Sequence, residues 1–236
     1  MIDGGMTPHG TYMAALKMTL ADGWKTYWRA PGDAGIPPTF SWRGSRNIGA
    51  MSISWPVPEV FYQNGMRSIG YERQLVLPLE ITPADPSRPV RLKGEMAFGI
   101  CEDVCIPGSA RFGHLVDPAA DRHPAIVAAL AAQPFSASEA GVRSAICHIR
   151  PTQSGLQIEA HVEMPPAGSV EAAVIEPGNP EIWASEPKVT RRGDTLIASS
   201  DLVHVAKGAY ALNRSNVRIT VLGDRHTVDI QGCAAG

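Results

Sequence analysis

The chain has 236 residues, of which 44% are hydrophobic and 19% charged, so it is long enough for one large or two ordinary folded domains and is not a disordered tail. Its net charge of −2, with no basic block, argues against nucleic acid or an anionic membrane as a partner. No window approaches the roughly 18 consecutive apolar residues that a membrane-spanning helix needs.

The first ten residues, MIDGGMTPHG, contain no charged stretch followed by an apolar one, so no signal peptide is visible. Taken alone, this start predicts a cytosolic protein, although a trimmed chain or a misplaced start would look the same. The four cysteines are compatible with an oxidising compartment and with the cytosol.

Alternating apolar and polar residues dominate the first half and predict half-buried strands of antiparallel sheets. The pattern is found in residues 11–20, 74–82 and 90–98. Asp22-Gly23 follows the first run and predicts a tight hairpin. Pro78 lies inside the second run and predicts an edge strand or a bulge, because proline cannot donate to a ladder.

Six aromatic residues follow the first run. Such a cluster is typical of a sandwich core, and a ligand platform is the less favoured alternative. Its members are Trp24, Tyr27, Trp28, Phe40, Trp42 and Trp55.

One segment has a helical pattern, residues 123–133, with Pro124 suited to the first turn. Polar stretches flank it, so we interpret residues 119–138 as a connector. Alternation returns in residues 156–164, and later Gly-Asp pairs mark turns. The sequence thus predicts an all-β protein with two immunoglobulin-like β-sandwich domains, residues 1–118 and 139–236, joined by a short helical connector.

The stretch FGICEDVCIPG, residues 98–108, places three residues between Cys101 and Cys105, ahead of a Pro-Gly pair that predicts a turn. An extended strand would hold their Cα atoms about 13 Å apart, whereas a disulfide needs about 4.4–6.8 Å. The segment must therefore turn back, as a hairpin tip or a single helical turn. A redox pair is the favoured interpretation, a structural bridge the second, and a metal site the weakest.

The other two cysteines suit a structural disulfide better. In the chain-entropy model, a Cys147–Cys233 bridge closes a loop of about 87 residues and contributes about 4.5 kcal/mol, against about 2 kcal/mol for the short loop. We expect it to join the first and last strands of the second domain. For a zinc site, Cys147-His148 is the conceivable second ligand pair, but it lies in the other domain.

Two carboxylates, Glu102 and Asp103, lie between the closely spaced cysteines. Negative charge beside a thiol disfavours the thiolate, so they should raise the cysteine pKa and make the thiol a poor nucleophile until a partner docks. The alternative is that both are simply solvated. Motifs typical of serine hydrolases, zinc proteases and phosphate-binding loops are absent from the sequence.

Three motifs occur in order along the chain: LADGWKTYWRAPGDAGIPPTFSW, WPVPEVFYQNGMRSIGYERQLVLPLEI and CEDVCIP. Together they resemble the N-terminal periplasmic domain of the thiol:disulfide interchange protein DsbD. The α-proteobacterial and ScsB-type versions, with two β-domains before the membrane part, are the most similar. The resemblance covers residues 10–117 and is much looser from 139 to 236.

The resemblance implies an immunoglobulin-like fold, a periplasmic location and the activity of a protein-disulfide reductase. A membrane domain would reduce the cysteine pair, which would then reduce disulfide isomerases, cytochrome c maturation thioredoxins or ScsC-like proteins. No cofactor and no metal are needed beyond the cysteines. Cys101 and Cys105 match the redox pair, and Cys105 matches the cysteine that forms the mixed disulfide with partners.

The resemblance also implies a cap, residues 61–71, that shields the pair until a partner docks. Phe61, Tyr62 or Tyr71 would be the contacting aromatic; the choice stays open because the best-known members have a shorter cap and a longer cysteine spacing. The chain lacks the family's membrane and thioredoxin-like domains, so we expect a fragment or a stand-alone relative. The rival hypothesis is a non-enzymatic β-sandwich that binds a partner protein or a soft metal such as copper, with structural disulfides only.

Overall fold

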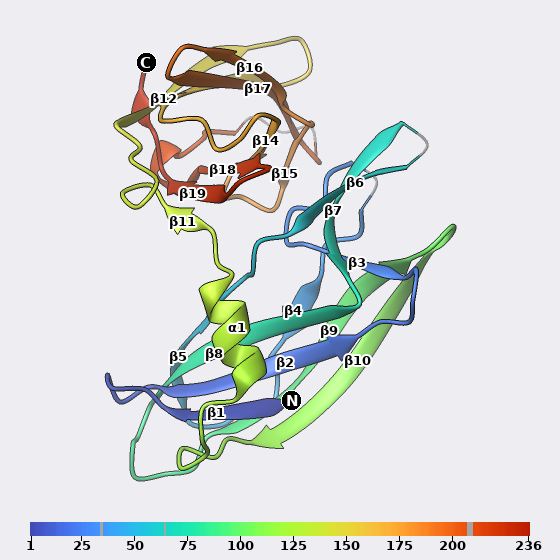
Figure 1. The fold of residues 1–236 in the computed structure, drawn as a ribbon, viewed down its shortest axis with the longest axis vertical. Helices are drawn as coiled ribbons and strands as arrows, with labels where there is room; N and C mark the ends of the chain where they lie inside the picture. The colour runs from blue at the N-terminus through green and yellow to red at the C-terminus, as the bar shows by residue number, and fades with distance from the viewer. Residues whose placement is uncertain (34, 64, 207–209) are drawn as a thin grey trace. The chain divides into compact units, whose positions relative to one another are not determined.

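The computed structural model describes residues 1–33, 35–63, 65–206 and 210–236, and the chain divides into two compact units, Met1–Gln133 and Pro134–Gly236 (Figure 1). Both units are built from mainly antiparallel sheets, so the predicted all-β class is confirmed. Among the described residues, no helix is long and apolar enough to cross a membrane.

The first unit contains two sheets. One has four strands in the order β1-β2-β8-β5; the other has the order β10-β9-β3-β7-β6, with β4 also paired to β9. The strands of the first sheet are β1 (Ile2–Met6), β2 (Tyr12–Thr19), β5 (Ile48–Ile53) and β8 (Gln74–Pro83). Those of the second are β3 (Lys25–Tyr27), β4 (Thr39–Ser41), β6 (Glu59–Gln63), β7 (Met66–Glu72), β9 (Arg91–Cys101) and β10 (Cys105–Leu115).

The core of this unit forms where alternating side chains of the two sheets meet. Ala14, Leu79 and Ile81 of the first sheet and Leu92 of the second are fully buried in one cluster. Trp42 packs against that cluster and stacks on Phe40, with ring centroids 6.0 Å apart. The aromatic cluster of the sequence therefore contributes to the sandwich core, as expected, although not with all its members.

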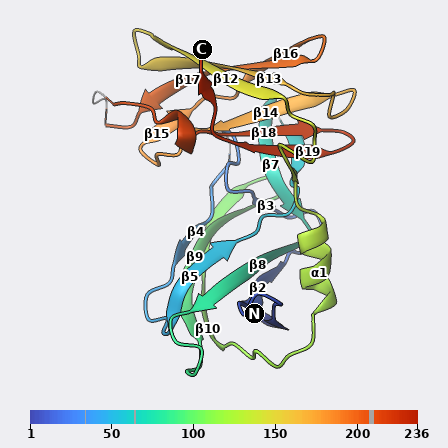
Figure 2. The ribbon, with the colours of Figure 1, turned by 90° about the vertical axis from the view of Figure 1, so that its left-hand side faces the viewer.

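The helix α1 (Pro124–Ala131) begins as predicted, with Pro124 in its first turn and the His123 ring capping it. Its Ile126 and Ala129 are buried against Ala15, on the face of β2 that points away from the core. The helix that we interpreted as part of a connector thus lies inside the first unit and covers the outer face of its four-stranded sheet (Figure 2). Apolar surfaces on helix and sheet bury each other there.

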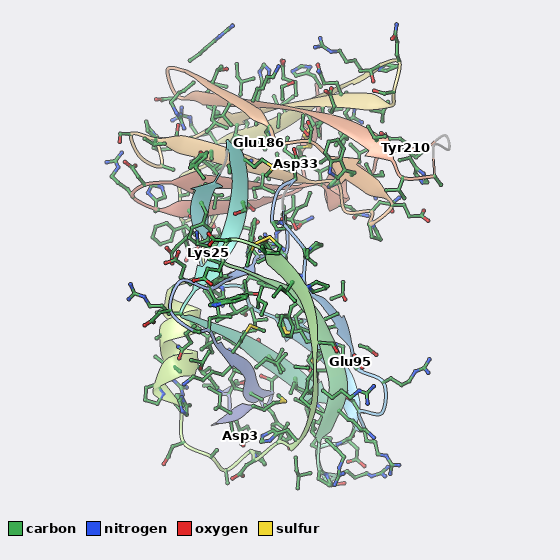
Figure 3. The ribbon with its side chains drawn as sticks, turned by 90° about the vertical axis from the view of Figure 1, so that its right-hand side faces the viewer. Asp3, Lys25, Asp33, Glu95, Glu186 and Tyr210 are labelled. Carbon is green, nitrogen blue, oxygen red and sulfur yellow. A yellow bond between two sulfur atoms is a disulfide. The ribbon has the colours of Figure 1, made fainter. Side chains whose placement is uncertain are left out.

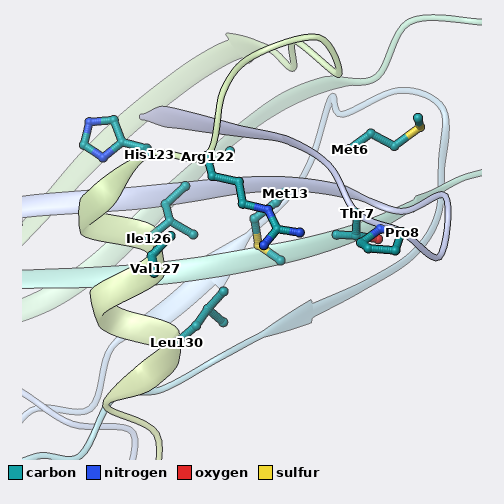
Figure 4. Close-up of a pocket in the computed structure, with 10 residues that line it drawn as sticks. Met6, Thr7, Pro8, Met13, Arg122, His123, Ile126, Val127 and Leu130 are labelled. Carbon is teal, nitrogen blue, oxygen red and sulfur yellow. The ribbon is translucent and has the colours of Figure 1, made fainter.

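A small cavity of about 220 Å³ remains beside α1 (Figure 4). Met6, Met13, Val127 and Leu130 line it, and the Arg122 side chain reaches over it. Because its lining includes no cysteine, it is separate from the candidate site.

The hairpin predicted at Asp22-Gly23 is wrong. β2 before the turn pairs with β1 and β8, whereas β3 after it pairs with β7 and β9 of the other sheet. Gly23 has φ +83°, so a tight turn is present. The dipeptide specifies a turn but not which strands pair, and here the turn carries the chain from one sheet to the other.

The prediction of an edge strand or bulge at Pro78 is also wrong, because β8 lies between β2 and β5 and its ladder with β2 is in regular register at this residue, opposite Ala15. The Pro78 carbonyl accepts a hydrogen bond from the Ser54 N–H at 2.9 Å. Since N–H and C=O of one strand residue point to the same side, the missing N–H also faces β5. The β5 ladder ends at Ile53, opposite Leu79, so no ladder donor is lost at Pro78.

The second unit also contains two sheets, ordered β11-β19-β18-β14 and β15-β17-β13-β12-β20, with β16 paired to β17. Fully buried Ile158, Leu196, Ile219 and Val228 fill its core from both sheets. The strands are β11 (Phe135–Ser136), β12 (Ser144–Pro151), β13 (Leu156–Glu163), β14 (Glu171–Glu176), β15 (Ile182–Ala184), β16 (Lys188–Arg192), β17 (Thr195–His204), β18 (Arg218–Gly223), β19 (Thr227–Gln231) and β20 (Ala234–Ala235), with a 3₁₀ turn, η1 (Arg214–Asn216).

Candidate active site

The closely spaced cysteines lie at the tip of a long antiparallel hairpin. Cys101 is the last residue of β9 and lies directly opposite Cys105, the first residue of β10. Their Cα atoms are 4.1 Å apart and their sulfur atoms form a disulfide. Of the two geometries expected for this segment, the structure has the hairpin tip. Pro107-Gly108, expected to form a turn, instead continues β10.

The two sulfur-bearing residues differ sharply in exposure. Cys101 is only 8% exposed, because β3 pairs with β9 on the side away from β10, with Lys25 opposite Cys101. Figure 3 labels Lys25 and draws a sulfur–sulfur bond in yellow near it. Cys105 is exposed, as are its neighbours Val104, at 70%, and Ile106, at 46%. A reagent from solution therefore meets Cys105 before Cys101.

Tyr27 of β3 contacts the exposed sulfur. Its hydroxyl lies 3.0 Å from Cys105 Sγ, and because a disulfide sulfur carries no hydrogen, the hydroxyl is the donor. Gly99 leaves room for the ring, since a Cβ there would lie 2.9 Å from it. Burial raises the pKa of Tyr27, so the phenol keeps its proton at neutral pH.

From the sequence, Tyr27 is expected in the aromatic core, without a connection to the cysteines. The two residues are 78 positions apart, and no motif spacing joins them. The structure joins them because β3, which carries Tyr27, pairs with β9, and the turn before β3 lies beside the cysteine loop. A Cβ at Gly23 would come within 2.8 Å of Glu102 Oε1.

Glu102 and Asp103 lie in the loop between the two cysteines, and both side chains are exposed. Their influence on the thiol pKa in the reduced protein stays a prediction.

The segment expected as a cap forms most of the β6–β7 hairpin, with residue 64 outside the described residues. The Phe61 ring lies 4.4 Å from Lys25 Nζ, above the β3 residue that is paired to the first cysteine. Tyr62 is 72% exposed. Tyr71 is buried, and its hydroxyl donates to the Pro56 carbonyl at 2.8 Å. Phe61 therefore has a side-chain contact to Lys25, the β3 neighbour of Cys101.

The second disulfide joins Cys147 to Cys233, the pairing expected from the sequence. Cys147 is fully buried in the core of the second unit, and Cys233 directly precedes β20, which pairs with β12. Cys147 is therefore not available, together with His148, as the second half of a zinc site. Within the described residues, no group of three or more His, Cys, Asp or Glu side chains is arranged to hold a metal ion.

Comparison with known proteins agrees with the resemblance seen in the sequence. Residues 6–117 match the family model described as "Thiol:disulfide interchange protein DsbD, N-terminal". The matched region contains every strand of the first unit's two sheets except most of β1, and it includes the Cys101–Cys105 disulfide and Tyr27. The resemblance to this family is thus confirmed for this part of the chain.

Among solved structures, the chain is similar to the N-terminal periplasmic domain of ScsB from Proteus mirabilis. The TM-score is 0.69 and the identity 22%, and the match covers 98% of this chain and 91% of the other. At this identity the likeness shows the fold, and it extends over nearly the whole chain. Comparison with curated proteins finds no match.

Proposed function

We propose that this chain, whose residues 6–117 match the DsbD N-terminal family, is a periplasmic thiol–disulfide exchange module. In this proposal a membrane reductase domain reduces the Cys101–Cys105 disulfide. The dithiol then reduces periplasmic disulfide proteins of the isomerase or thioredoxin-like kind. The two cysteines are the only redox groups that this chemistry requires.

The observation that carries the proposal is a disulfide at a hairpin tip with one exposed and one buried half. Access decides which sulfur of a disulfide is attacked. A donor thiolate attacks Cys105 Sγ, and Cys101 leaves as a thiolate. A second donor thiolate then releases Cys105, so that two electrons enter the pair.

In the outward direction the same steps run with the roles exchanged. The Cys105 thiolate attacks a sulfur of the partner disulfide, whose other sulfur leaves as a thiolate. Cys101 then attacks Cys105 Sγ and releases the reduced partner. Cys105 is therefore the exchanging cysteine and Cys101 the resolving one.

Tyr27 supports this assignment because its hydroxyl already points at the exchanging sulfur. After reduction the same hydroxyl would donate to a thiolate, and hydrogen bonds to a charged acceptor are stronger than those to a neutral one. It therefore favours the thiolate and opposes the effect that we predict for Glu102 and Asp103. Tyr27 touches the reacting atom and is a catalytic residue of the proposed exchange.

The β6–β7 hairpin is proposed as the cap, with Phe61 as the residue that restricts access. Its ring lies against Lys25, which is next to the buried cysteine across the sheet. A docking partner would have to move or contact this ring to reach the pair. This proposal excludes Tyr62, which is exposed to solvent. It also excludes Tyr71, which is buried and donates its hydroxyl hydrogen bond to the Pro56 carbonyl.

The test is to trap partners with single-cysteine variants in a periplasmic extract. Cys101→Ala should accumulate a covalent complex through Cys105, because nothing remains to resolve it, and Cys105→Ala should trap little. Equal trapping by both variants would reject the assignment of roles. If a mild dithiol fails to reduce the Cys101–Cys105 bond while the fold persists, the exchange proposal is rejected in favour of the rival hypothesis of a non-enzymatic binding domain.

A further inference from the structure

The exchanging cysteine begins an edge strand. Across the described residues, β10 pairs only with β9, and its other side has no strand partner. The strand runs from Cys105 to Leu115. An exposed edge of this length is a template for pairing with another chain, and soluble proteins usually block such edges.

The direction of the backbone groups along this edge follows from neighbouring hydrogen bonds. Arg91 of β9 exchanges both backbone hydrogen bonds with Arg46, on the side away from β10, and the Val90 carbonyl accepts from Val116 N–H. The backbone N–H and C=O groups of successive strand residues point alternately to the two sides, and the β9–β10 register is continuous. The backbone groups of Cys101 therefore point away from β10, like those of Arg91. Its pair with Cys105 is thus non-hydrogen-bonded, which agrees with the 4.1 Å between the Cα atoms.

The outward-facing positions of β10 are therefore the odd-numbered ones. Pro107 is such a position, so its missing N–H costs no bond to β9. Arg111 is another, and its side chain is paired with Glu95. A proline and a charged residue on an edge strand disfavour pairing with another chain at their own positions. Cys105 and Ser109, however, still present backbone N–H and C=O groups outward. Gly108 has no side chain, and Ser109 and Ala110 have small ones, which leaves room for a neighbouring strand.

We infer that the outer edge of β10 from Cys105 to Ser109 is a docking edge, on which the thiol partner adds an extended segment that carries its reactive cysteine. This inference rests on the proposed function. A partner residue opposite Cys105 would form a hydrogen-bonded pair, with its Cα about 5.5 Å away. That spacing lies within the roughly 4.4–6.8 Å that a disulfide requires. Backbone pairing of this kind is a recognised mode of peptide binding.

The geometry also suits the chemistry of resolution. The partner cysteine, Cys105 and Cys101 would occupy three adjacent strands at the same level, with their sulfur atoms in a row across the sheet. The Cys105 thiolate attacks the partner sulfur, and the partner's second cysteine leaves as a thiolate that takes a proton from water. Cys101 then attacks Cys105 Sγ from the opposite side and expels the partner's first cysteine as a thiolate. Two electrons pass to the partner, and the proposed membrane dithiol restores them.

Synthetic peptides can test the edge without an identified partner. The probe is an extended peptide of about six β-branched residues with one cysteine, activated as a mixed disulfide with thionitrobenzoate. It reacts with Cys105 of the Cys101→Ala variant and releases the coloured thiolate. N-methylation of the residues two positions from the peptide cysteine removes N–H groups that face β10, whereas methylation one position away removes N–H groups that face outward.

The first methylated peptide should react about tenfold more slowly than the unmodified one, and the second should react at nearly the unmodified rate, since a net hydrogen bond is worth a severalfold change. Equal rates for all three peptides would overturn the docking edge. A small aromatic disulfide that still reacts with Cys105 would leave the proposed exchange function standing. Failure of Cys105 to react with any disulfide would reject that function itself.

A backbone variant gives a second, independent measurement. Ser109→Pro removes one outward N–H and keeps the bonds to β9, as Pro107 does, and Ser109→Ala is the matched control for the side chain. In the Cys101→Ala background, the proline variant should slow the unmodified peptide about fivefold and leave the small disulfide unaffected. Thermal unfolding identifies a misfolded variant, and the peptide series with the parent protein then decides the question. An unchanged peptide rate in folded Ser109→Pro contradicts the inference.

Discussion

The two disulfides of this chain have opposite surroundings. Cys101–Cys105 closes a three-residue loop at an exposed hairpin tip, whereas Cys147–Cys233 spans 86 positions and is anchored in the core of the second unit by the fully buried Cys147. The first removes little entropy from the unfolded chain and is open to attack. The second removes much more and is shielded.

In this chain, loop length and burial together decide whether a disulfide stays closed or can exchange. A bond that stabilises the fold must stay closed, so it benefits from a long loop and an apolar shell. A bond that exchanges must be opened without unfolding its domain, so it benefits from a short loop and one exposed sulfur. Each prediction below tests one side of this contrast.

The largest difference is expected in the rate of reduction. Under native conditions a dithiol should reduce Cys101–Cys105 at least about a thousandfold faster than Cys147–Cys233, because the buried bond reacts only after local or global unfolding of its unit. Differential alkylation followed by mass spectrometry measures both rates in one sample. Similar rates would remove the distinction between the two bonds.

The second prediction concerns stability. Replacing both Cys147 and Cys233 by alanine should lower the free energy of unfolding by about 4.5 kcal/mol, whereas replacing both Cys101 and Cys105 should lower it by only about 2 kcal/mol. Urea unfolding followed by a separate probe for each unit measures the two losses. The reverse order would show that the short bond is the structural one.

The third prediction concerns Tyr27. Tyr27→Phe keeps the ring and removes the hydroxyl that lies 3.0 Å from Cys105 Sγ. Loss of a hydrogen bond to the charged form raises the pKa of the Cys105 thiol, so alkylation of the Cys101→Ala variant near neutral pH should slow about fivefold. The profile of rate against pH should move to higher pH. An unmoved profile would make Tyr27 a packing residue only.

The fourth prediction concerns the cap. Phe61→Ala should speed reduction of Cys101–Cys105 by a small thiol about threefold, because it removes the ring beside Lys25. Tyr62→Ala is the matched control on the same strand, and it should leave the rate unchanged since Tyr62 is 72% exposed. Stopped-flow fluorescence with glutathione compares them. Equal rates for both variants and the parent would exclude Phe61 as the cap.

The smallest effect is expected from the loop carboxylates. Glu102→Gln combined with Asp103→Asn removes two negative charges beside the thiols and should lower the pKa of Cys105. Because both groups are exposed and screened by solvent, the alkylation rate near neutral pH should rise only about twofold. A rate that falls instead would mean that these carboxylates do not disfavour the thiolate.

Much of the local structure could be predicted from the sequence. Alternation in residues 11–20 and 74–82 marked the strands β2 and β8, and Pro124 marked the start of α1. The disulfide distance limit required the segment between Cys101 and Cys105 to turn back. These predictions depend on neighbours along the chain, where periodicity and turn chemistry act directly.

Pairing between distant segments was decided only by the tertiary structure. The turn at Asp22-Gly23 crosses between sheets, and Pro78 lies in an interior strand at the point where a ladder ends. Neither follows from the local residues, because a turn dipeptide or a proline limits its own backbone but does not choose a partner strand.

The site divides in the same way. The sequence by itself determined which two cysteines are close enough along the chain to close a short loop. It also determined which two are far enough apart to form a disulfide that stabilises the fold. Only the tertiary structure decided that β3 covers Cys101 while Cys105 stays exposed. It also decided that the Tyr27 hydroxyl lies at the Cys105 sulfur. The physical reason is that exposure and hydrogen bonding depend on which strands are neighbours in space. The strands β3 and β9 are neighbours although their paired residues are more than 70 positions apart in the sequence.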